Sequence, residues 1–438
     1  MLNKKKNEKY AYVALSVDIL HEGHINILKT ASKYGRVIVG LLTDEAIATY
    51  KKNIPIMSFE KRKLIISDIK YVYKVVKQET LDYTKNLKLF RPDYVVHGDD
   101  WKKNAQKKTR TEVIKTLKKW SGKLIEPKYT KNISSDLLKH KISEIVSMPE
   151  NRVSKLNRLI KSKNIVRILE SHNSLTGLII EKINIKKKHT IEFDGMWSSS
   201  LTDSATKGMP DNSSLSFSSR ISSLRDMMDV TTKPLIFDAD DGGRIEHIAF
   251  LTRSLEMSGV SAIIMEDKIG LKKNSLFKNQ SGVKQDNPFN FSKKIHKICK
   301  TRKSKDFLVI ARIESFILGK GLKDALKRAE IYSKAGADAI LIHSKEKTPS
   351  EIFSFAKQFK KNKYYIPLVS VPSTYSKVLE KDLIKNGFKI VIYANQLLRS
   401  AYPAMKNTAI SILKNGRAYE ADKKIISIQD IINLIKND

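Results

Sequence analysis

The sequence is poor in cysteine, and its 438 residues contain only Cys299. A disulfide framework within one chain is therefore excluded, and a reducing compartment is favoured. No run of about 20 apolar residues occurs, so no segment is expected to span a membrane. Asp18 and His21 interrupt the first apolar stretch, and we see no secretory signal. We expect a cytoplasmic protein.

Acidic residues are also scarce, with 46 Asp and Glu against 82 Lys and Arg, which gives a net charge of +36. Such a charge can indicate a nucleic-acid or membrane partner. The lysines, however, are spread along the whole chain, without an RNA-binding motif or a basic stripe with interleaved aromatic residues. We therefore expect no nucleic acid and no membrane as partners; anionic phosphate substrates would be attracted by the same charge.

The apolar fraction of 41% is sufficient for ordinary buried cores. Within residues 1–140, short apolar runs alternate with helical patterns. Strands are expected at 12–15, 37–42, 71–76, 93–97 and 123–126, with helices near 24–33, 59–69 and 106–120. This alternation predicts a parallel, doubly wound sheet in an α/β domain.

Residues 141–164 are charged and helical in pattern, with Pro149 as a break, and are interpreted as a linker. Over residues 165–438 the alternation restarts. Eight strands are expected, at 166–169, 193–197, 235–239, 262–266, 308–313, 339–343, 367–370 and 390–393. This number of strand–helix units in about 240 residues predicts a (β/α)8 barrel.

Polar residues and one tryptophan stand at or just after the ends of most of these expected barrel strands. They are Glu170, His172, Trp197, Ser199, Asp238, Asp240, Glu266, Arg312, Glu314 and His343. Active sites of such barrels lie at the carboxyl ends of the strands. Any one of these residues could be an ordinary surface residue, but together they predict one shared site.

Three carboxylates, Asp238, Asp240 and Glu266, follow consecutive strands and could hold Mg²⁺. The alternative, that the aspartates cap a helix, is weaker because adjacent carboxylates repel one another without a cation. Arg312 lies within an apolar strand, where a charge needs a partner. A phosphoryl or carboxylate group suits its guanidinium. A pair with Glu314 is favoured less, because it requires a regular strand with both side chains inward.

The segment Glu266–Ser275 reads EDKIGLKKNS and matches the EDK-x3-K-x-N-S loop of phosphoenolpyruvate mutase. The segments 197–201, 237–240, 311–314 and 343–345 follow that family's motifs in the same order. Residues 165–438 therefore resemble phosphoenolpyruvate mutase, of the isocitrate lyase superfamily. The resemblance implies Mg²⁺-dependent isomerisation of phosphoenolpyruvate to 3-phosphonopyruvate, which forms the C–P bond in phosphonate biosynthesis.

The resemblance also implies roles for individual residues. Asp238 would bind the metal directly, and Asp240 and Glu266 would bind it through water. The substrate-binding residues would be Trp197, Ser199, Leu201 and Ser275, of which the first three hold the pyruvate part.

Arg312 would bind the phosphoryl group or stabilise the enolate, with His343 nearby. Lys272 and Asn274 would come from a gating loop that excludes water. Asp211 would lie near the migrating phosphoryl group, as a nucleophile or as a positioning group. The chain departs from the family at Ser198 and Ser200, where glycines are usual, and at 241–243; residues 183–190 look like an insertion.

In the N-terminal domain, His21-Glu22-Gly23-His24 follows the first strand and opens a helix. Two imidazoles at a helix N-terminus, with a glycine that allows close approach, suit a phosphate group. Together with segments 42–45, 60–62 and 96–101, the motif resembles the HxGH cytidylyltransferases, which implies a Rossmann-like nucleotidyltransferase domain. His21 and His24 would stabilise the departing pyrophosphate. The nucleotide-binding residues would be Asp18, Gly23, Lys52 (or Lys51), Arg62, Asp99, Thr130 and Ser134.

The fusion of these two domains is similar to the bifunctional enzyme of fosfomycin biosynthesis, an antibiotic pathway. It implies CTP and a phosphonate, such as 2-hydroxyethylphosphonate, as further substrates. It also implies a homo-oligomer, a dimer or a tetramer, because mutases exchange a barrel helix.

Two alternatives stay open. Tyr129 stands where the cytidylyltransferases have an arginine, which favours a nucleotide-sensing or structural N-terminal domain. The barrel could instead hydrolyse phosphonopyruvate or cleave a C–C bond. Lyases of the superfamily, however, carry a cysteine in the gating loop, and Cys299 lies outside that loop. The hydrolases lack the complete lysine–asparagine–serine loop.

Overall fold

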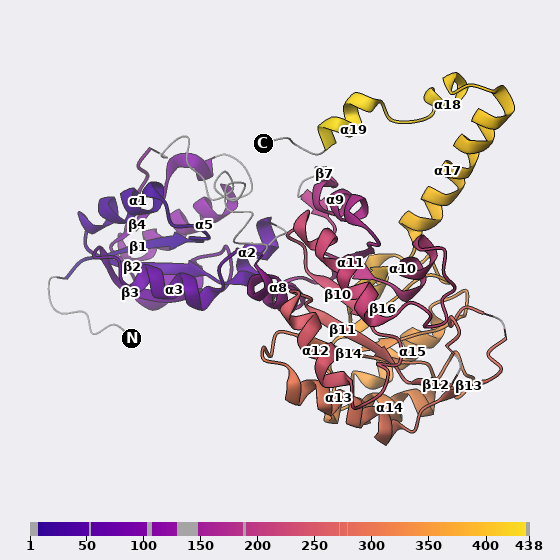
Figure 1. The fold of residues 1–438 in the computed structure, drawn as a ribbon. Coiled ribbons are helices and arrows are strands. Elements are labelled where there is room, and N and C mark those ends of the chain that lie inside the picture. Colours follow the sequence, from indigo (N-terminus) through magenta and orange to yellow (C-terminus); the bar gives the residue numbers. More distant parts are fainter. Residues whose placement is uncertain are drawn as a thin grey trace.

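The computed structural model describes residues 8–51, 54–102, 107–128, 148–186, 190–270, 272–277 and 279–434. They form an N-terminal α/β domain, a barrel and a helical C-terminal extension (Figure 1). Within these residues, no helix combines the length and the apolar character needed to cross a membrane.

The N-terminal domain contains a five-stranded parallel sheet with the strand order β3-β2-β1-β4-β5. The strands are β1 (Tyr10–Leu15), β2 (Arg36–Leu42), β3 (Val72–Gln78), β4 (Tyr94–Val96) and β5 (Lys123–Ile125). The helices are α1 (Glu22–Ser32), α2 (Asp44–Lys51), α3 (Phe59–Ser67), α4 (Thr84–Phe90) and α5 (Lys107–Leu117). The predicted Rossmann-like fold is confirmed. The strand order reverses between β1 and β4, where sheets of this type bind ligands.

The second domain is a closed barrel of eight parallel strands. In chain order they are β6 (Val166–Glu170), β9 (Gly195–Ser198), β10 (Leu235–Asp238), β11 (Ala262–Glu266), β14 (Leu308–Ile313), β15 (Ala339–Ile342), β16 (Leu368–Ser370) and β17 (Phe388–Tyr393). The predicted barrel is confirmed, although the second strand begins at Gly195 rather than at residue 193.

Helices and two hairpins complete the barrel domain. The helices are α9 (Ser174–Lys182), α10 (Ser200–Thr206), α11 (Phe217–Asp229), α12 (Ile248–Met257), α13 (Pro288–Thr301), α14 (Gly321–Lys334), α15 (Ser350–Phe359) and α16 (Glu380–Lys385). Strands β7 (Asn184–Lys186) and β8 (Thr190–Glu192) pair where the insertion was expected. Strands β12 (Lys268–Gly270) and β13 (Val283–Gln285) pair at the base of the expected gating loop.

Helix α8 (Pro149–Ser162) lies within the expected linker and covers the amino-terminal end of the barrel. Proline is favoured in the first turn of a helix, and Pro149 is the first residue of α8. Leu156 and Leu159 are buried in the same apolar cluster as Val166 and Leu308 of the strands. The Arg152 guanidinium donates to the carbonyls of Met228 and Thr231, at 2.9 and 2.6 Å, just before β10.

The N-terminal domain attaches through the same helix. Ala48 of α2 and Ile54 share the apolar cluster of Leu156 and Leu159. The N-terminal domain therefore joins the barrel at the end opposite the carboxyl ends of the strands.

The C-terminal extension consists of α17 (Gln396–Asn415), α18 (Tyr419–Asp422) and α19 (Ile428–Leu434). Helix α17 runs away from the barrel (Figure 1), whereas the end of α19 returns to it, since the Lys182 ammonium of α9 donates to the Leu434 carbonyl. No residue of α17 is buried. Large apolar side chains are exposed along it, with Tyr402 at 64%, Met405 at 62% and Leu413 at 85%. The buried Glu170 carboxylate at the end of β6 accepts hydrogen bonds from the amides of Leu397 and Leu398, at 2.8 and 3.1 Å, and so fixes where α17 begins.

Candidate active site

A pocket opens at the carboxyl ends of the barrel strands. Its lining includes most of the residues expected there, namely Trp197, Ser199, Leu201, Asp211, Asp238, Glu266, Lys272, Asn274, Ser275, Arg312 and His343. Asp240 lines an adjoining pocket together with Glu266 and Lys272. Glu170 and His172 are not among the lining residues, because Glu170 holds α17 and its carboxylate is 2.8 Å from Nδ1 of His172.

The carboxylates expected to hold a metal follow β10 and β11. Asp238 ends β10, and its Oδ1 accepts from the amide of Asp240 at 3.2 Å. Neither aspartate caps the next helix, because residue 247 is the N-cap of α12. Burial raises the pKa of Glu266, which ends β11, to about 7, although the charges of Arg312 and Lys268 act in the opposite direction. Burial also raises the pKa of Asp240, against the charge of Lys272.

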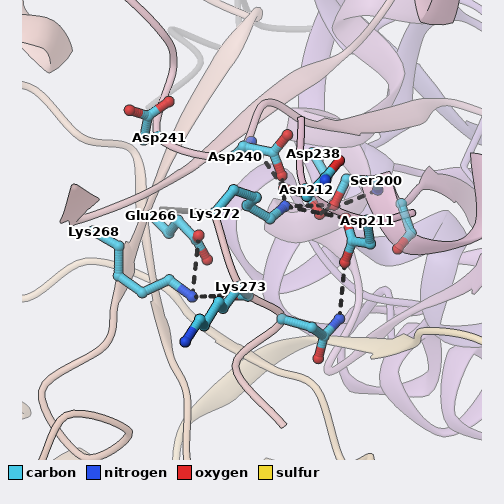
Figure 2. A network of polar contacts seen from close by, with 12 residues as sticks. Ser200, Asp211, Asn212, Asp238, Asp240, Asp241, Glu266, Lys268, Lys272 and Lys273 are labelled. Atoms are coloured by element: carbon cyan, nitrogen blue, oxygen red, sulfur yellow. Dashed lines mark hydrogen bonds and ion pairs between the residues drawn. The ribbon is translucent and has the colours of Figure 1, made fainter. Parts of the chain in front are cut away.

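Lys272 brings the gating loop into this carboxylate cluster (Figure 2). Its ammonium donates to Asp240 and to Oγ of Ser200, the latter at 3.0 Å, and lies 3.3 Å from Asp211. Burial acts to lower the pKa of Lys272, but the surrounding carboxylates, Asp240 foremost, raise it above its usual value. The lysine is therefore charged and offsets the repulsion among the carboxylates.

Asp211 and Asn274 meet across the pocket. The amide of Asn274 donates to Oδ2 of Asp211 at 3.1 Å, which joins the gating loop to the segment that follows α10. Burial acts to raise the pKa of Asp211, but Lys272 and the hydrogen bonds from Asn274 and Ser200 outweigh it and lower the pKa. Asp211 is therefore a carboxylate at neutral pH.

Arg312 is the centre of a second cluster. Its Nε donates to Glu314 at 2.5 Å, and its Nη2 donates to Oγ of Ser275 at 2.8 Å. The expectation that the pair with Glu314 is the less favoured one was wrong: the strand is regular up to Ile313, so alternate residues share the inner face. Arg312 nevertheless lines the pocket, and its Nη2 is 3.4 Å from Glu266.

His343, at the end of β15, is buried beside this pair. Its Nδ1 lies 2.9 Å from Nη2 of Arg312 and 3.1 Å from Glu314. Burial, and then the charge of Arg312, lower the pKa of His343. Because a guanidinium can only donate, Nδ1 accepts from Arg312, and the imidazole is neutral at pH 7.

Sequence reasoning missed several residues that hold this site. The Lys268 ammonium lies 3.2 Å from Glu266 and donates to Oγ of Ser275 at 2.8 Å. Arg220 donates to the Asp238 carbonyl at 2.5 Å and to Asp203 at 2.8 Å. Lys268 could have been found from its place in the matched loop, whereas Arg220 stands in a helical pattern that does not distinguish it from surface arginines.

The oxygen donors at the ends of β10 and β11 fit a hard cation. Mg²⁺ is usually bound through one or two carboxylates, with water and substrate oxygens completing its coordination. Within the described ranges, no group of three His, Cys, Asp or Glu side chains forms a complete ligand set. Asp238, Asp240 and Glu266 supply oxygen atoms of the kind that Mg²⁺ takes.

The N-terminal domain brings its two motif histidines together at the start of α1. The rings of His21 and His24 have centroids 3.9 Å apart, and the His21 amide donates to Nδ1 of His24 at 3.3 Å. Gly23 is half-buried in the first turn. Burial lowers the pKa of His21, so this imidazole is neutral at pH 7.

Asp99 and Arg62 were also expected to bind the nucleotide, and they lie in other elements of the N-terminal domain. Asp99 begins the short helix η1 (Asp99–Lys102) after β4. Arg62 is fully buried and donates to the carbonyls of Ser16 and Met57 and to Asp44, so its guanidinium is committed to its own domain. Lys52, Thr130 and Ser134 lie outside the described residues.

Comparison with known proteins decides the family. The family model described as phosphoenolpyruvate phosphomutase matches residues 156–413, and the cytidylyltransferase-like model matches residues 16–141. The chain belongs to the phosphoenolpyruvate phosphomutase family. It is an enzyme of this superfamily with a cytidylyltransferase-like domain fused ahead of the barrel.

Three relatives illustrate the likeness. The phosphoenolpyruvate phosphomutase of Tetrahymena pyriformis is 37% identical over 66% of this chain and 92% of that protein. The solved phosphoenolpyruvate phosphomutase of Streptomyces platensis subsp. rosaceus is 32% identical, with a TM-score of 0.59 over 64% of this chain and 94% of that one. A phosphonopyruvate hydrolase solved with oxalate and Mg²⁺ is 33% identical, with a TM-score of 0.58 over 65% and 94%. Overall identity therefore does not separate mutase from hydrolase.

The contact between His343 and Arg312 should control the pKa of the imidazole. Replacing Arg312 with Gln removes a positive charge that lowers the pKa of His343, while Glu314 stays in place, so this pKa should rise. Nitrogen-15 NMR titration of the imidazoles measures it, and His343→Asn assigns the signal. Arg302→Gln, which removes an arginine paired with Asp338 instead, should leave the pKa unchanged. An unchanged His343 pKa in Arg312→Gln contradicts the assignment.

Proposed function

We propose that the barrel interconverts phosphoenolpyruvate and 3-phosphonopyruvate in a Mg²⁺-dependent reaction of phosphonate biosynthesis. The observation that carries the proposal is the contact of Lys272 and Asn274 with Asp211 over the pocket. A phosphoryl group that leaves oxygen has to be captured by carbon before water reaches it. A loop that joins both sides of the pocket supports this requirement.

Asp238, with Asp240 and Glu266, would hold the metal, which would neutralise the carboxylate and enolate oxygens of the substrate. Residues of the chain would bind and orient the substrate. Arg312 is charged and lines the pocket, so its guanidinium would bind the phosphoryl group. Trp197, Ser199 and Leu201 would orient the pyruvate part.

Asp211 is ionised and would face the migrating phosphoryl group. Lys272 and Asn274 would hold the loop closed and exclude water. The reaction breaks the P–O bond of phosphoenolpyruvate and forms a P–C bond to carbon 3, with no net gain or loss of protons. Asp211 can serve this transfer as a nucleophile or by positioning the group.

The mutase and hydrolase proposals differ in their product from phosphonopyruvate. Phosphorus NMR with Mg²⁺ should show phosphoenolpyruvate, because the mutase equilibrium favours it. Asn274→Ala should lower turnover by roughly 10²-fold, since the loop loses its contact with Asp211. Asn279→Ala, in the same loop segment but exposed, is the matched control and should retain activity. Free phosphate as the main product of the unmodified protein would assign it to the hydrolases instead.

For the N-terminal domain we propose CTP-dependent cytidylyl transfer to a phosphonate such as 2-hydroxyethylphosphonate. The pairing of His21 and His24 at the start of α1 carries this proposal. The two imidazoles and the helix N-terminus would stabilise charge on the departing pyrophosphate. The acceptor oxygen forms a new bond to the α-phosphorus of CTP, and the bond to pyrophosphate breaks.

Pyrophosphate release from CTP, Mg²⁺ and a panel of phosphonates tests this activity. His24→Ala should lower the rate by about 10²–10³-fold, as expected for loss of one group that stabilises the transition state. His296→Ala, an exposed histidine of α13, should not change it. Binding of CTP without pyrophosphate release, with every phosphonate, favours the alternative of a nucleotide-sensing domain.

We also propose that the chain forms a homo-oligomer in which α17 packs against a second copy. The support is the exposure of its apolar side chains, Met405 and Leu413 among them. Exposed apolar surface of this kind marks an interaction site.

Light scattering after size-exclusion chromatography should give the mass of a dimer or a tetramer. Met405→Glu combined with Leu413→Glu should shift the protein to the monomer, because burial of these charges is unfavourable. As a control, Lys406→Glu combined with Lys414→Glu introduces two glutamates on the same helix without removing an apolar side chain. A monomeric unmodified protein would contradict the proposal.

A further inference from the structure

Arg158 of α8 extends from the barrel side into the N-terminal domain. Its Nε and Nη2 donate to Oδ2 of Asp44 at 3.2 and 3.0 Å. Its Nη1 donates to the Ile56 carbonyl at 2.9 Å, and its Nη2 also donates to the Pro55 carbonyl at 2.6 Å. The side chain is 16% exposed, so water competes little for these groups. One guanidinium thus binds both the start of α2 and the segment that leads to α3.

The groups that Arg158 binds are connected to the turn before the histidine motif. The other oxygen of Asp44 accepts from Nη2 of the buried Arg62 at 2.7 Å. Arg62 then donates to the Ser16 carbonyl at 2.5 Å and to the Met57 carbonyl at 3.1 Å. This series of contacts runs from α8 to the turn that follows β1.

A second connection runs through Asp18. Its Oδ1 accepts from the amides of Ile56, at 2.5 Å, and Met57, at 3.4 Å. Arg158 binds the carbonyl of Ile56, whose amide is bound by Asp18. Segment 55–57 is therefore held between the barrel helix and the turn that leads to His21.

The turn itself needs such support. Val17 has φ of 45°, a left-handed conformation that is unfavourable for a β-branched residue. Strained backbone of this kind persists only where its surroundings impose it, and it occurs often at functional sites. Arg62 binds the residue before Val17, and the residue after it, Asp18, binds segment 55–57.

We propose that Arg158 is a positioning residue for the nucleotide site of the N-terminal domain. Through segment 55–57, Asp44 and Arg62, it fixes the turn at residues 16–18 and with it the histidines that follow. The inference rests on the proposed cytidylyl transfer. Lys52, expected to bind the triphosphate, stands in the sequence between the two segments that Arg158 holds. Helix α8, which packs on the barrel, thus contributes a residue to the nucleotide site.

The chemistry of the side chain makes this assignment testable. Arginine provides donors in a rigid fork, whereas lysine provides one point charge on a flexible stem. Lysine at position 158 can keep an ion pair with Asp44 but cannot bind Asp44 and two carbonyls at once. Arg158→Lys should therefore restore only part of what Arg158→Ala loses.

The test uses the full-length protein with Arg158→Ala and Arg158→Lys. Hydrogen exchange should become faster at the amides of Ile56 and Met57, because the segment that carries them is released. The KM for CTP should rise roughly tenfold, with a smaller change in kcat, as expected when a binding geometry is loosened and the reacting groups are retained. Turnover of phosphonopyruvate by the barrel should be unchanged.

Asn157→Ala is the matched control. Asn157 is the preceding residue of α8, and its amide donates to Asp306 of the barrel at 2.6 Å. This variant should leave both the exchange of segment 55–57 and the KM for CTP as they are. If it raised the KM as much as Arg158→Ala does, general loosening of α8 would replace the proposed role.

The outcomes separate this inference from the function on which it rests. If the unmodified protein neither binds CTP nor releases pyrophosphate, the proposed function fails, and faster exchange in Arg158→Ala would then report only a structural contact. If the unmodified protein turns over CTP and the Arg158 variants keep its KM, the positioning role is overturned. Should Arg158→Ala unfold the N-terminal domain, the intermediate KM and exchange expected of Arg158→Lys decide the question.

Discussion

The packing of α8 between two domains is the constraint on which the rest of the structure depends. One side of the helix supplies Leu156 and Leu159 to the amino-terminal end of the barrel, and Arg158 reaches the N-terminal domain. Since the pocket lies at the other end of the strands, the N-terminal domain is attached far from the barrel mouth. A compound made in the barrel would have to leave through that mouth, because side chains fill the barrel interior.

Charge balance governs the barrel mouth. Parallel strands bring Asp238, Asp240 and Glu266 to one edge, where like charges in a buried setting are unfavourable. Lys272 and Lys268 lie among these carboxylates, so the segment that lines one side of the pocket also offsets its negative charge. Attraction between these opposite charges holds the segment against the carboxylates.

Neither the fold nor the family determines which reaction the barrel catalyses. A mutase and a hydrolase share this barrel at nearly the same identity to the chain, 32% and 33%. In the proposed reaction, the product would depend on whether water reaches the phosphoryl group. Ser200, where the family usually has a glycine, contacts Lys272, so even a departure from the motif takes part in holding the loop.

The sequence by itself determined both folds, all eight barrel strands and many of the residues that line the pocket. Apolar periodicity and strand-end polarity are local properties, so they can be read without coordinates. Only the tertiary structure decided how those residues pair. It joined Arg312 to Glu314, placed Glu170 at the start of α17, and buried Arg62 in a network that reaches the barrel. It also showed that Arg158, one basic residue among many in the linker, enters the N-terminal domain. Except for Arg312 and Glu314, which are two residues apart, these pairings join groups that are far apart along the chain, and no local pattern encodes them.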